Sequence, residues 1–383
     1  MEKLYSLIPE FLRNFYENQF LSFPLLIKVA YVGIFISFLV IISCYLIIFI
    51  RRLNQARMNS KVTKWKSEID QILTNSIIVF NSEEYQEQDI RDIVDNLKKL
   101  PLKKYIVRQL VINELMFLHK NFSGKVNTLI STIYEWLHLE EHSKRKLSSW
   151  RWFKKAEGIE ELSEMGIESV AGRLLKHVNS KNITLRMQAQ SGYLQLSKND
   201  PFVFLDYTNQ NLLPWHQINL MDVLNRRKDI QLPLFSKWFN SPNDSIVIFC
   251  IRLMVRFHQM ESVKELLKLI KHPNEQVRKE MITAIGELSL VDSERHLTIH
   301  FLNESAACRL EIIKSVGKIA SGDELDFLNR LIFSPDFEIR FEAAKAIARH
   351  GEKGETVLYN LMETVPDENK SVILHMLDKR LSA

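Results

Sequence analysis

The chain has 383 residues, a formal net charge of +5 at pH 7 and three cysteines. Three cysteines exclude the disulfide framework of a small secreted domain, and so modest a charge argues against wholesale binding of nucleic acid. With 11 glycines, 10 prolines and no long apolar–polar alternation, the sequence favours an all-helical protein.

The first predicted element is a transmembrane helix at residues 25–50, which follows a short non-cytoplasmic tail at residues 1–24. Residues 29–50 carry no charge, and at ~1.5 Å per residue they span about 33 Å, enough for a bilayer core. A cleaved signal peptide is the competing interpretation, but no small-residue cleavage site precedes Arg51. The aromatic residues and leucines of residues 5–23 fit either an interfacial segment or a floppy tail.

Basic residues flank this apolar run: Lys28, Arg51, Arg52 and Arg57. Because the tail is nearly neutral, the positive-inside rule places residues 51–383 in the cytoplasm. The expected location is the inner (cytoplasmic) membrane of a bacterium, crossed once. We interpret residues 51–62 as a basic juxtamembrane linker that faces anionic lipid.

Residues 63–165 are predicted to form a helical region of degenerate repeats. In it, His138-Leu-Glu-Glu-His142 matches the His-x-x-Glu-His pattern of inverted zinc proteases. That chemistry requires two histidines one turn apart on zinc, with Glu141 as general base. Since no third ligand follows in a second helical motif, we interpret the motif as a solvated helix end.

Basic and aromatic residues alternate in residues 144–155. Tryptophan favours interfaces and lysine favours anionic lipid, so the segment is a candidate for contact with lipid headgroups. The alternative is a repeat helix that buries Trp150 and Phe153. We favour burial because aromatic pairs at i,i+3 spacing usually belong to a core.

Residues 242–371 repeat with a 31-residue period. Pro242, Pro273, Pro335 and Pro366 fall on this grid, and Glu304 occupies the vacant node. Apolar residues recur at helical spacing after Pro273, and residues 263–270 form a second short amphipathic pattern. Each unit is therefore predicted to be a helical hairpin, with proline at the start of its second helix. A fixed period of this length indicates a solenoid, in which each unit buries its apolar face against its neighbours.

Equivalent positions of the repeat carry similar residues. One column is apolar and contains Leu266, Leu297 and Leu328. Two further columns are small: Ala284, Ser315 and Ala346, then Gly286, Gly317 and Ala348. Because glycine inside a helix costs about 1 kcal/mol relative to alanine, we expect neighbouring helices to approach closely there. Cys250 and Cys308 fall on apolar repeat helices and are expected to be reduced, structural thiols.

The pattern Pro-x-x-x-Val-Arg-x-x-x-x-x-Ala-Ile-Gly-x-Leu at residues 273–288 resembles HEAT repeats, particularly the short HEAT-like repeats of bacterial proteins and phycobilin lyases. The resemblance implies an all-α fold, an α-solenoid of HEAT-like hairpins at residues 166–383 preceded by a single transmembrane helix. It also implies that the arginine column links neighbouring turns through carboxylates. The column contains Arg186, Arg278, Arg309 and Arg340, and the nearby carboxylates are Glu275, Glu304 and Asp336.

A row of cations follows the same register: Arg252, Arg256, Lys314, Lys318, Lys345 and Arg349. In HEAT-like solenoids the helix that carries them normally lines the concave face. We interpret the row as a candidate docking surface for a protein partner, such as an acidic segment. Glu311 with Lys314 and Glu342 with Lys345 are i,i+3 pairs, and an ordinary charged helix surface explains the row equally well.

The favoured function is a membrane-tethered, non-enzymatic scaffold that binds a membrane enzyme or an envelope assembly, with no cofactor and no metal. The sequence contains no phosphate-cradling glycine loop, no Cys-x-x-Cys and no nucleophile elbow. Similarity to the phycobilin lyases leaves open a lyase- or chaperone-like protein for a chromophore-sized ligand. A nucleic-acid-binding HEAT-like protein is the third interpretation, which the membrane anchor argues against. Neither the partner nor the oligomeric state follows from the sequence.

Overall fold

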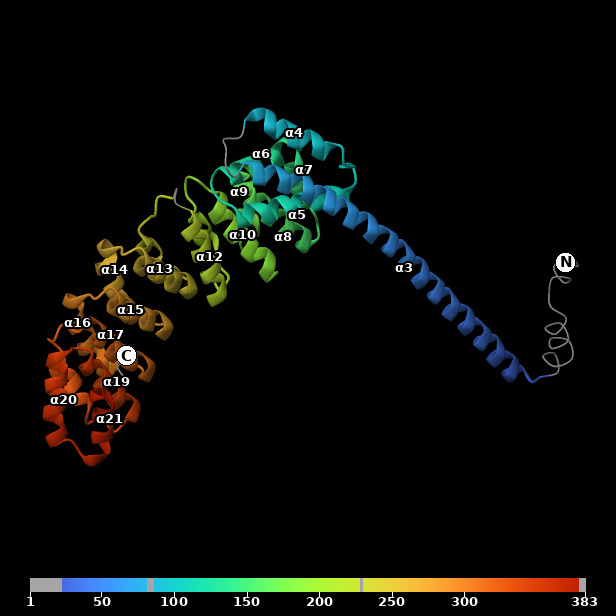
Figure 1. Ribbon diagram of the computed structural model, residues 1–383. Coiled ribbons are helices and arrows are strands. Elements are labelled where there is room, and N and C mark those ends of the chain that lie inside the picture. The colour runs from blue at the N-terminus through green and yellow to red at the C-terminus, as the bar shows by residue number, and fades with distance from the viewer. Residues whose placement is uncertain (1–22, 81–85, 228–229, 379–383) are drawn as a thin grey trace, which may run out of the picture. The chain divides into compact units, whose positions relative to one another are not determined.

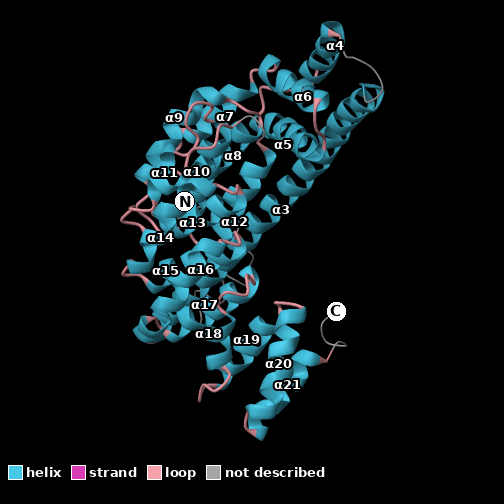
Figure 2. Cartoon of the chain, turned by 90° about the vertical axis from the view of Figure 1, so that its left-hand side faces the viewer, coloured by secondary structure: helices cyan, strands magenta, loops and turns pink. Residues whose placement is uncertain are grey.

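The computed structural model describes residues 23–80, 86–227 and 230–378. Of the predicted tail, residues 1–22 lie outside this part, and with them almost all of the aromatic segment at residues 5–23. The described chain is entirely helical, with no β-strand (Figures 1 and 2), which confirms the predicted all-α class. It divides into two compact units, Met1–Leu139 and Glu140–Ala383.

The first unit begins with a single long helix, α3 (Leu25–Phe80). Its sequence contains no proline and one glycine, Gly33, so nothing interrupts the helical hydrogen bonds. Residues 51–62, which we interpreted as a linker, continue this helix. The apolar half is long enough to cross a membrane, and none of its most apolar window is buried. At the other end of the helix, Ile69 and Leu73 are buried.

The buried end of α3 packs against α4 (Glu87–Lys98) and α5 (Tyr105–Asn121), and α6 (Lys125–Trp136) packs against both of these. Aliphatic side chains at helical spacing supply the core of this small bundle. The fully buried ones include Leu97, Val107, Val111, Ile112, Leu115, Leu129 and Ile130. This part of the helical region predicted at residues 63–165 is a bundle with its core drawn from four helices.

The second unit is a row of helical hairpins. The first pairs α7 (Leu139–Leu147) with α8 (Trp152–Glu164). We call the second helix of each hairpin the inner helix: α8, α10 (Ile183–Leu196), α12 (Pro214–Arg226), α13 (Asp244–Arg256), α15 (Glu275–Glu287), α17 (Ala306–Ile319), α19 (Phe337–Ala348) and α21 (Asp367–Leu377). Most inner helices pack directly against the next one. This stacking is the geometry of a solenoid.

The first helices of the hairpins, the outer helices, lie on the opposite side. In Figure 1, α14, α16 and α20 line one side of this unit, and the inner helices α13, α15, α17 and α19 line the other. After α7, the outer helices are α9 (Ala171–Leu174), α11 (Val203–Tyr207), α14 (Val263–Lys268), α16 (Val291–His300), α18 (Leu325–Leu331) and α20 (Glu352–Thr364). A single 3₁₀ turn, η4 (Phe235–Trp238), replaces the outer helix before α13.

Capping residues fix where the inner helices begin. A side-chain oxygen of the residue before the helix accepts a hydrogen bond from a first-turn N–H at Asn182, Asn243, Asn274, Ser305 and Asp336. Each cap satisfies one of the four N–H groups that a helix leaves without a partner. Pro242, Pro273 and Pro335 lie one residue before the cap, and Pro366 is itself the cap, so none of them lies within the first helical turn as we had expected.

The small-residue columns lie where adjacent inner helices approach most closely. A Cβ placed on Gly286 would lie 2.8 Å from the Cα of Ser315, and one on Gly317 would lie 2.8 Å from the Cα of Ala346. The Oγ of Ser315 donates to the carbonyl oxygen of Ile282 across the same contact (2.9 Å). This confirms the predicted close approach and explains why glycine is retained inside these helices.

The predicted apolar positions form the core of the repeats. Leu266, Leu297 and Leu328 are fully buried. Cys250 and Cys308 are buried and unbridged in inner helices, as predicted, and burial is the main cause that raises the pKa of both thiols. Cys44 is exposed on α3.

The junction between α12 and α13, which we call the seam, differs from the other junctions. These two inner helices make few direct contacts. Polar groups bridge the seam instead, and four hydrogen bonds have the following donors and acceptors: Trp238 Nε1 to Asp206 Oδ1 (2.6 Å), Asn243 Nδ2 to Gln210 O (3.1 Å), Leu212 N to Ser245 Oγ (2.8 Å) and Arg252 Nη1 to Gln217 Oε1 (2.9 Å). A cavity of about 850 Å³ opens beside them.

Candidate functional site

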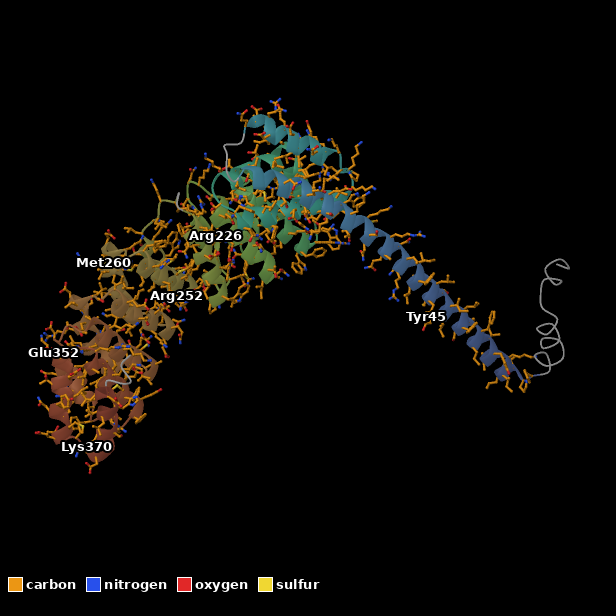
Figure 3. The ribbon with its side chains drawn as sticks, in the orientation of Figure 1. Tyr45, Arg226, Arg252, Met260, Glu352 and Lys370 are labelled. Carbon is orange, nitrogen blue, oxygen red and sulfur yellow. The ribbon has the colours of Figure 1, made fainter. Side chains whose placement is uncertain are left out.

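The predicted cation row lies on the inner helices. Arg252 and Arg256 belong to α13, Lys314 and Lys318 to α17, and Lys345 to α19; Arg349 caps the C-terminal end of α19. Figure 3 shows Arg252 on the side of the inner helices, with Met260 and Glu352 on the outer side. The other members of the row belong to inner helices as well, and we call this side of the solenoid the inner face.

Arg252 is neutralised by the adjacent repeat. Its Nε and Nη2 donate to the two carboxylate oxygens of Glu280, each at 2.7 Å, and its Nη1 donates to Gln217. Bidentate pairing of this kind is among the stronger polar contacts in proteins, and the hydrogen bond to Glu280 is the first cause that raises the pKa of Arg252. The side chain thus joins three inner helices, α12, α13 and α15, and is a structural clamp.

Two further members of the row are paired more weakly. Arg256 Nη2 donates to Asn225 Oδ1 at 3.3 Å, and Lys318 Nζ lies 3.7 Å from Glu287 Oε1. Both members of the second pair are substantially exposed, so the ion pair adds little to stability. These side chains remain accessible to a partner at small cost.

Lys314, Lys345 and Arg349 have no carboxylate partner in the described part of the chain. Lys314 and Lys345 occupy equivalent positions on α17 and α19, which pack side by side. The predicted pairs Glu311–Lys314 and Glu342–Lys345 are not among the ion pairs formed by the described residues. We call these three residues the cation cluster. They are the members of the predicted row whose charge no carboxylate of the described chain neutralises.

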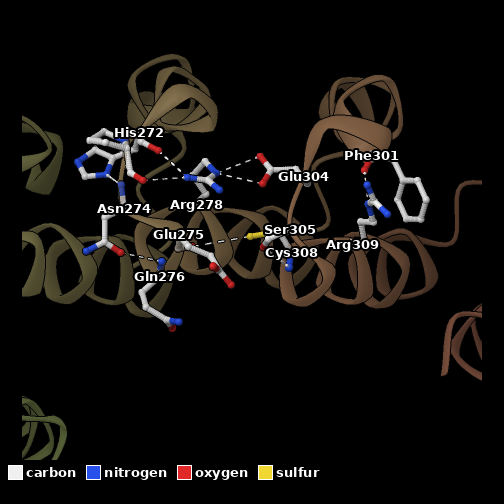
Figure 4. Close-up of polar contacts among 11 residues, drawn as sticks. His272, Asn274, Glu275, Gln276, Arg278, Phe301, Glu304, Ser305, Cys308 and Arg309 are labelled. Atoms are coloured by element: carbon white, nitrogen blue, oxygen red, sulfur yellow. Dashed lines mark hydrogen bonds and ion pairs between the residues drawn. The ribbon is translucent and has the colours of Figure 1, made fainter. Parts of the chain in front are cut away.

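The arginine column stabilises the fold, but mostly through contacts other than the predicted ones. Arg278 Nε lies 3.0 Å from Glu304 Oε2, and its Nη1 donates to the carbonyl oxygen of His272 (2.8 Å; Figure 4). Arg309 donates to the carbonyl oxygens of Phe301 and Leu302.

Arg340 likewise donates to Ser334 O and Pro335 O, and Arg186 donates to Ser180 O. The prediction of carboxylate partners is therefore correct for Arg278 and wrong for the others. Their guanidinium groups instead bind carbonyls in the segment between the preceding outer helix and the inner helix that carries them.

The two histidines of the protease-like motif do not share a helix. His138 lies in a turn with φ of +52°, and His142 is buried in α7. Two histidines bind one zinc in this motif only when a helix presents them on the same face. Within the described ranges, no group of three or more His, Cys, Asp or Glu side chains is placed to hold a metal ion.

The predicted burial of Trp150 and Phe153 is wrong. Trp150 is 85% exposed and Phe153 is 47% exposed. The prediction assumed that one helix carries both, but α8 begins at Trp152. Trp150 lies in the connection before it, where the i,i+3 rule does not apply.

The cavity at the seam is lined by both polar and apolar side chains. Its lining includes Asn209, Asn211, Asn240 and Lys237, together with the carboxylates Asp206 and Asp244. Both carboxylates have partners, since Asp206 binds Trp238 and Asp244 binds Asn274. The cavity therefore does not provide the inward-facing acidic cluster that the chromophore interpretation requires.

No protein-family model matches the chain, and no curated protein matches it in sequence. Among solved structures, it is similar to one engineered protein with 14% identity over 84% of this chain and 98% of that one (TM-score 0.35). It is similar to a second engineered protein with 14% identity over 69% and 95% (TM-score 0.21).

A third similar chain comes from a structure that concerns tubulin recruitment and assembly by microtubule polymerases with arrays of tumour overexpressed gene (TOG) domains. Its identity is 11% over 82% of this chain and 98% of that one, with a TM-score of 0.25. At these TM-scores the likenesses carry no argument about function. The description of the chain as an all-α repeat protein rests on its own helical hairpins.

Proposed function

We propose that the protein is a single-pass membrane scaffold whose solenoid binds a protein partner on its inner face. The observation that carries the proposal is the cation cluster, Lys314, Lys345 and Arg349, which remains unneutralised while Arg252 on the same face is clamped by Glu280. Unpaired cations on adjacent helices attract an acidic segment and steer its approach. The partner is a membrane enzyme or a member of an envelope assembly.

The apolar half of α3 supports the membrane anchor. It is exposed throughout, and burying that surface in a bilayer removes it from water. The basic residues Arg51, Arg52 and Arg57 then face the cytoplasm, on the inner side of a bacterial membrane. A tether of this kind raises the effective concentration of the solenoid near membrane partners, so a modest intrinsic affinity suffices.

A non-enzymatic role fits the inner face. It offers amphipathic helix surfaces and amine or guanidinium groups, which suit contact with an acidic protein segment. The proposal therefore assigns the protein neither substrate nor cofactor.

The test is crosslinking in intact cells followed by detergent extraction and quantitative proteomics. The variant Lys314→Glu/Lys345→Glu/Arg349→Glu reverses the cation cluster. The control Lys264→Glu/Lys271→Glu/Lys353→Glu makes the same change of charge on exposed lysines at the outer helices. We expect a membrane protein that is enriched by the wild type and the control to be lost from the cluster variant.

Equal enrichment by all three proteins would refute the inner face as the docking surface. The anchor is tested separately by extraction of membranes with alkaline carbonate, after which the full chain should stay in the membrane pellet. A protein released into the supernatant would refute the anchor without bearing on the cation cluster.

A further inference from the structure

The connection between α7 and α8 carries exposed aromatic residues on the second unit. Trp150 is 85% exposed, and Trp152 and Phe153 are 47% exposed. Arg151 lies over the Trp150 ring at 5.1 Å and near the Phe153 ring at 6.0 Å. We call these four residues the aromatic tip. Adjacent exposed aromatic rings are unusual on a soluble surface and indicate a contact with another phase or molecule.

A buried ion pair and close helix packing hold together the hairpin that carries the aromatic tip. Lys146 Nζ donates to Glu161 Oε1 at 2.5 Å and to Glu157 Oε1 at 2.9 Å, and both Lys146 and Glu161 are buried. Ser143 Oγ donates to the other oxygen of Glu161. At Gly158 the helices are so close that a Cβ would lie 2.8 Å from the carbonyl oxygen of Ser143. This packing holds the rings of the tip outward.

The surroundings of the tip are strongly basic. Residues 144–155 include six cations and no acid: Lys144, Arg145, Lys146, Arg151, Lys154 and Lys155. Lys144 and Lys146 are paired with glutamates, and Arg145 and Arg151 are exposed.

Neighbouring helices add further positive charge. Burial, and then the charges of Lys155, Arg173 and Lys176, lower the pKa of His177. Arg173 also donates to Ser148 Oγ in the tip connection (2.9 Å). Cations therefore continue from the tip onto the neighbouring helix α9 and the turn after it.

We propose that the aromatic tip docks on the anionic lipid surface of the membrane that anchors the chain. Tryptophan rings prefer the headgroup level of a bilayer, and arginine and lysine are attracted by anionic lipid. The chain carries its own apolar segment at residues 29–50, which keeps a bilayer close at hand. The proposal rests on the membrane anchor of the proposed function and is independent of the inner face.

The test uses the full chain in nanodiscs of zwitterionic and anionic phospholipid, with or without brominated acyl chains that quench nearby tryptophan. The reporter variant is Trp150→Phe/Trp152→Phe, which keeps the aromatic character of the tip. The matched control is Trp215→Phe, which removes an exposed tryptophan of α12. We expect brominated lipid to quench the wild type and the control about twofold or more strongly than the reporter variant.

A second variant tests the charge. Arg145→Glu/Arg151→Glu/Lys155→Glu retains both tryptophans and should lose most of their quenching, as each cation near an anionic surface strengthens association about fivefold. The triple variant Lys264→Glu/Lys271→Glu/Lys353→Glu is the control. The quenching should also fall at ~1 M salt, where the screening length is about 3 Å.

Three other results would each contradict the lipid contact. Equal quenching of the wild type and the reporter variant, in nanodiscs that contain the protein, would overturn the lipid contact and leave the anchor intact. Failure of the full chain to enter nanodiscs would overturn the anchor and this inference with it. Absence of quenching at the tip, together with its crosslinking to a protein in cells, would assign the aromatic tip to a protein partner.

Discussion

His216 on α12 is a buried histidine with a lowered pKa. Its Nε2 lies among protein atoms and has no hydrogen-bond partner in the described chain. Burial, and secondarily the charge of Arg186, lower the pKa of His216 to about 4. In the unfolded chain the pKa of this histidine has its ordinary value near 6.5. Between about pH 4 and pH 6.5 the unfolded chain therefore binds more protons than the folded chain.

Stability should therefore fall as the pH decreases from about 6.5 to about 4, by up to roughly 3 kcal/mol from this group. The variant His216→Gln removes this titration and should flatten that part of the pH dependence. The exposed His296→Gln provides the control. Thermal unfolding of the detergent-solubilised chain across this pH range is the measurement, and equal slopes for His216→Gln and wild type would contradict the prediction.

Arg278 illustrates how much one residue of the arginine column contributes to the stability of the fold. The variant Arg278→Ala leaves Glu304 buried without its cation and should destabilise the repeat by about 3 kcal/mol. Arg309→Ala removes bonds to backbone carbonyls and a contact with the Phe301 ring but no ion pair, so its cost should be nearer 1–2 kcal/mol. Melting temperatures that fell equally for both variants would show that the ion pair adds nothing to the carbonyl bonds.

At the scale of elements, the contact between α17 and α19 depends on Gly317. A methyl group there meets the backbone of Ala346 at 2.8 Å, so the helices must separate. We expect Gly317→Ala to destabilise the protein by about 1–3 kcal/mol, despite the better helix propensity of alanine. The control is Gly172→Ala in α9, where a Cβ meets nothing within 4 Å; a melting temperature lowered by Gly317→Ala alone is the expected result.

The repeat core was predictable because a periodic sequence places equivalent residues in equivalent environments. Leu266, Leu297 and Leu328 are buried for this reason, and Gly286 and Gly317 mark the close contacts. The caps Asn243, Asn274, Ser305 and Asp336 follow the same 31-residue period and could have been recognised by their side-chain oxygens.

The charged face was less predictable because its pairing depends on the offset between neighbouring helices. Arg252 on α13 forms an ion pair with Glu280 on the neighbouring helix α15. Lys345 occupies the equivalent position of its repeat but has no carboxylate partner in the described chain. Trp150 escaped prediction for a related reason. Its exposure depends on where α8 begins, and periodicity does not locate a helix start.

For the whole molecule, the seam between α12 and α13 divides the solenoid. Gln217 and Ser245 supply the acceptors of two of its hydrogen bonds. The double variant Gln217→Ala/Ser245→Ala should leave the hairpins before and after the seam folded but separate their unfolding into two steps, because a solenoid is cooperative only through its junctions. Hydrogen exchange during chemical denaturation would detect the two steps.

Arg226→Ala is the matched control, since the ion pair of Arg226 with Asp222 lies within α12. A single cooperative transition in the double variant would show that the seam is no weaker than the other junctions.

Like springs joined in series, the junctions of a repeat protein share an applied load, and the most compliant junction bends most. Apolar junctions such as that between α17 and α19 resist opening because separation exposes their side chains to water. At the seam, water can replace the hydrogen bonds as they break. Curvature imposed by a load on the solenoid should therefore be absorbed between α12 and α13, so that the hairpins on each side turn as nearly rigid arms.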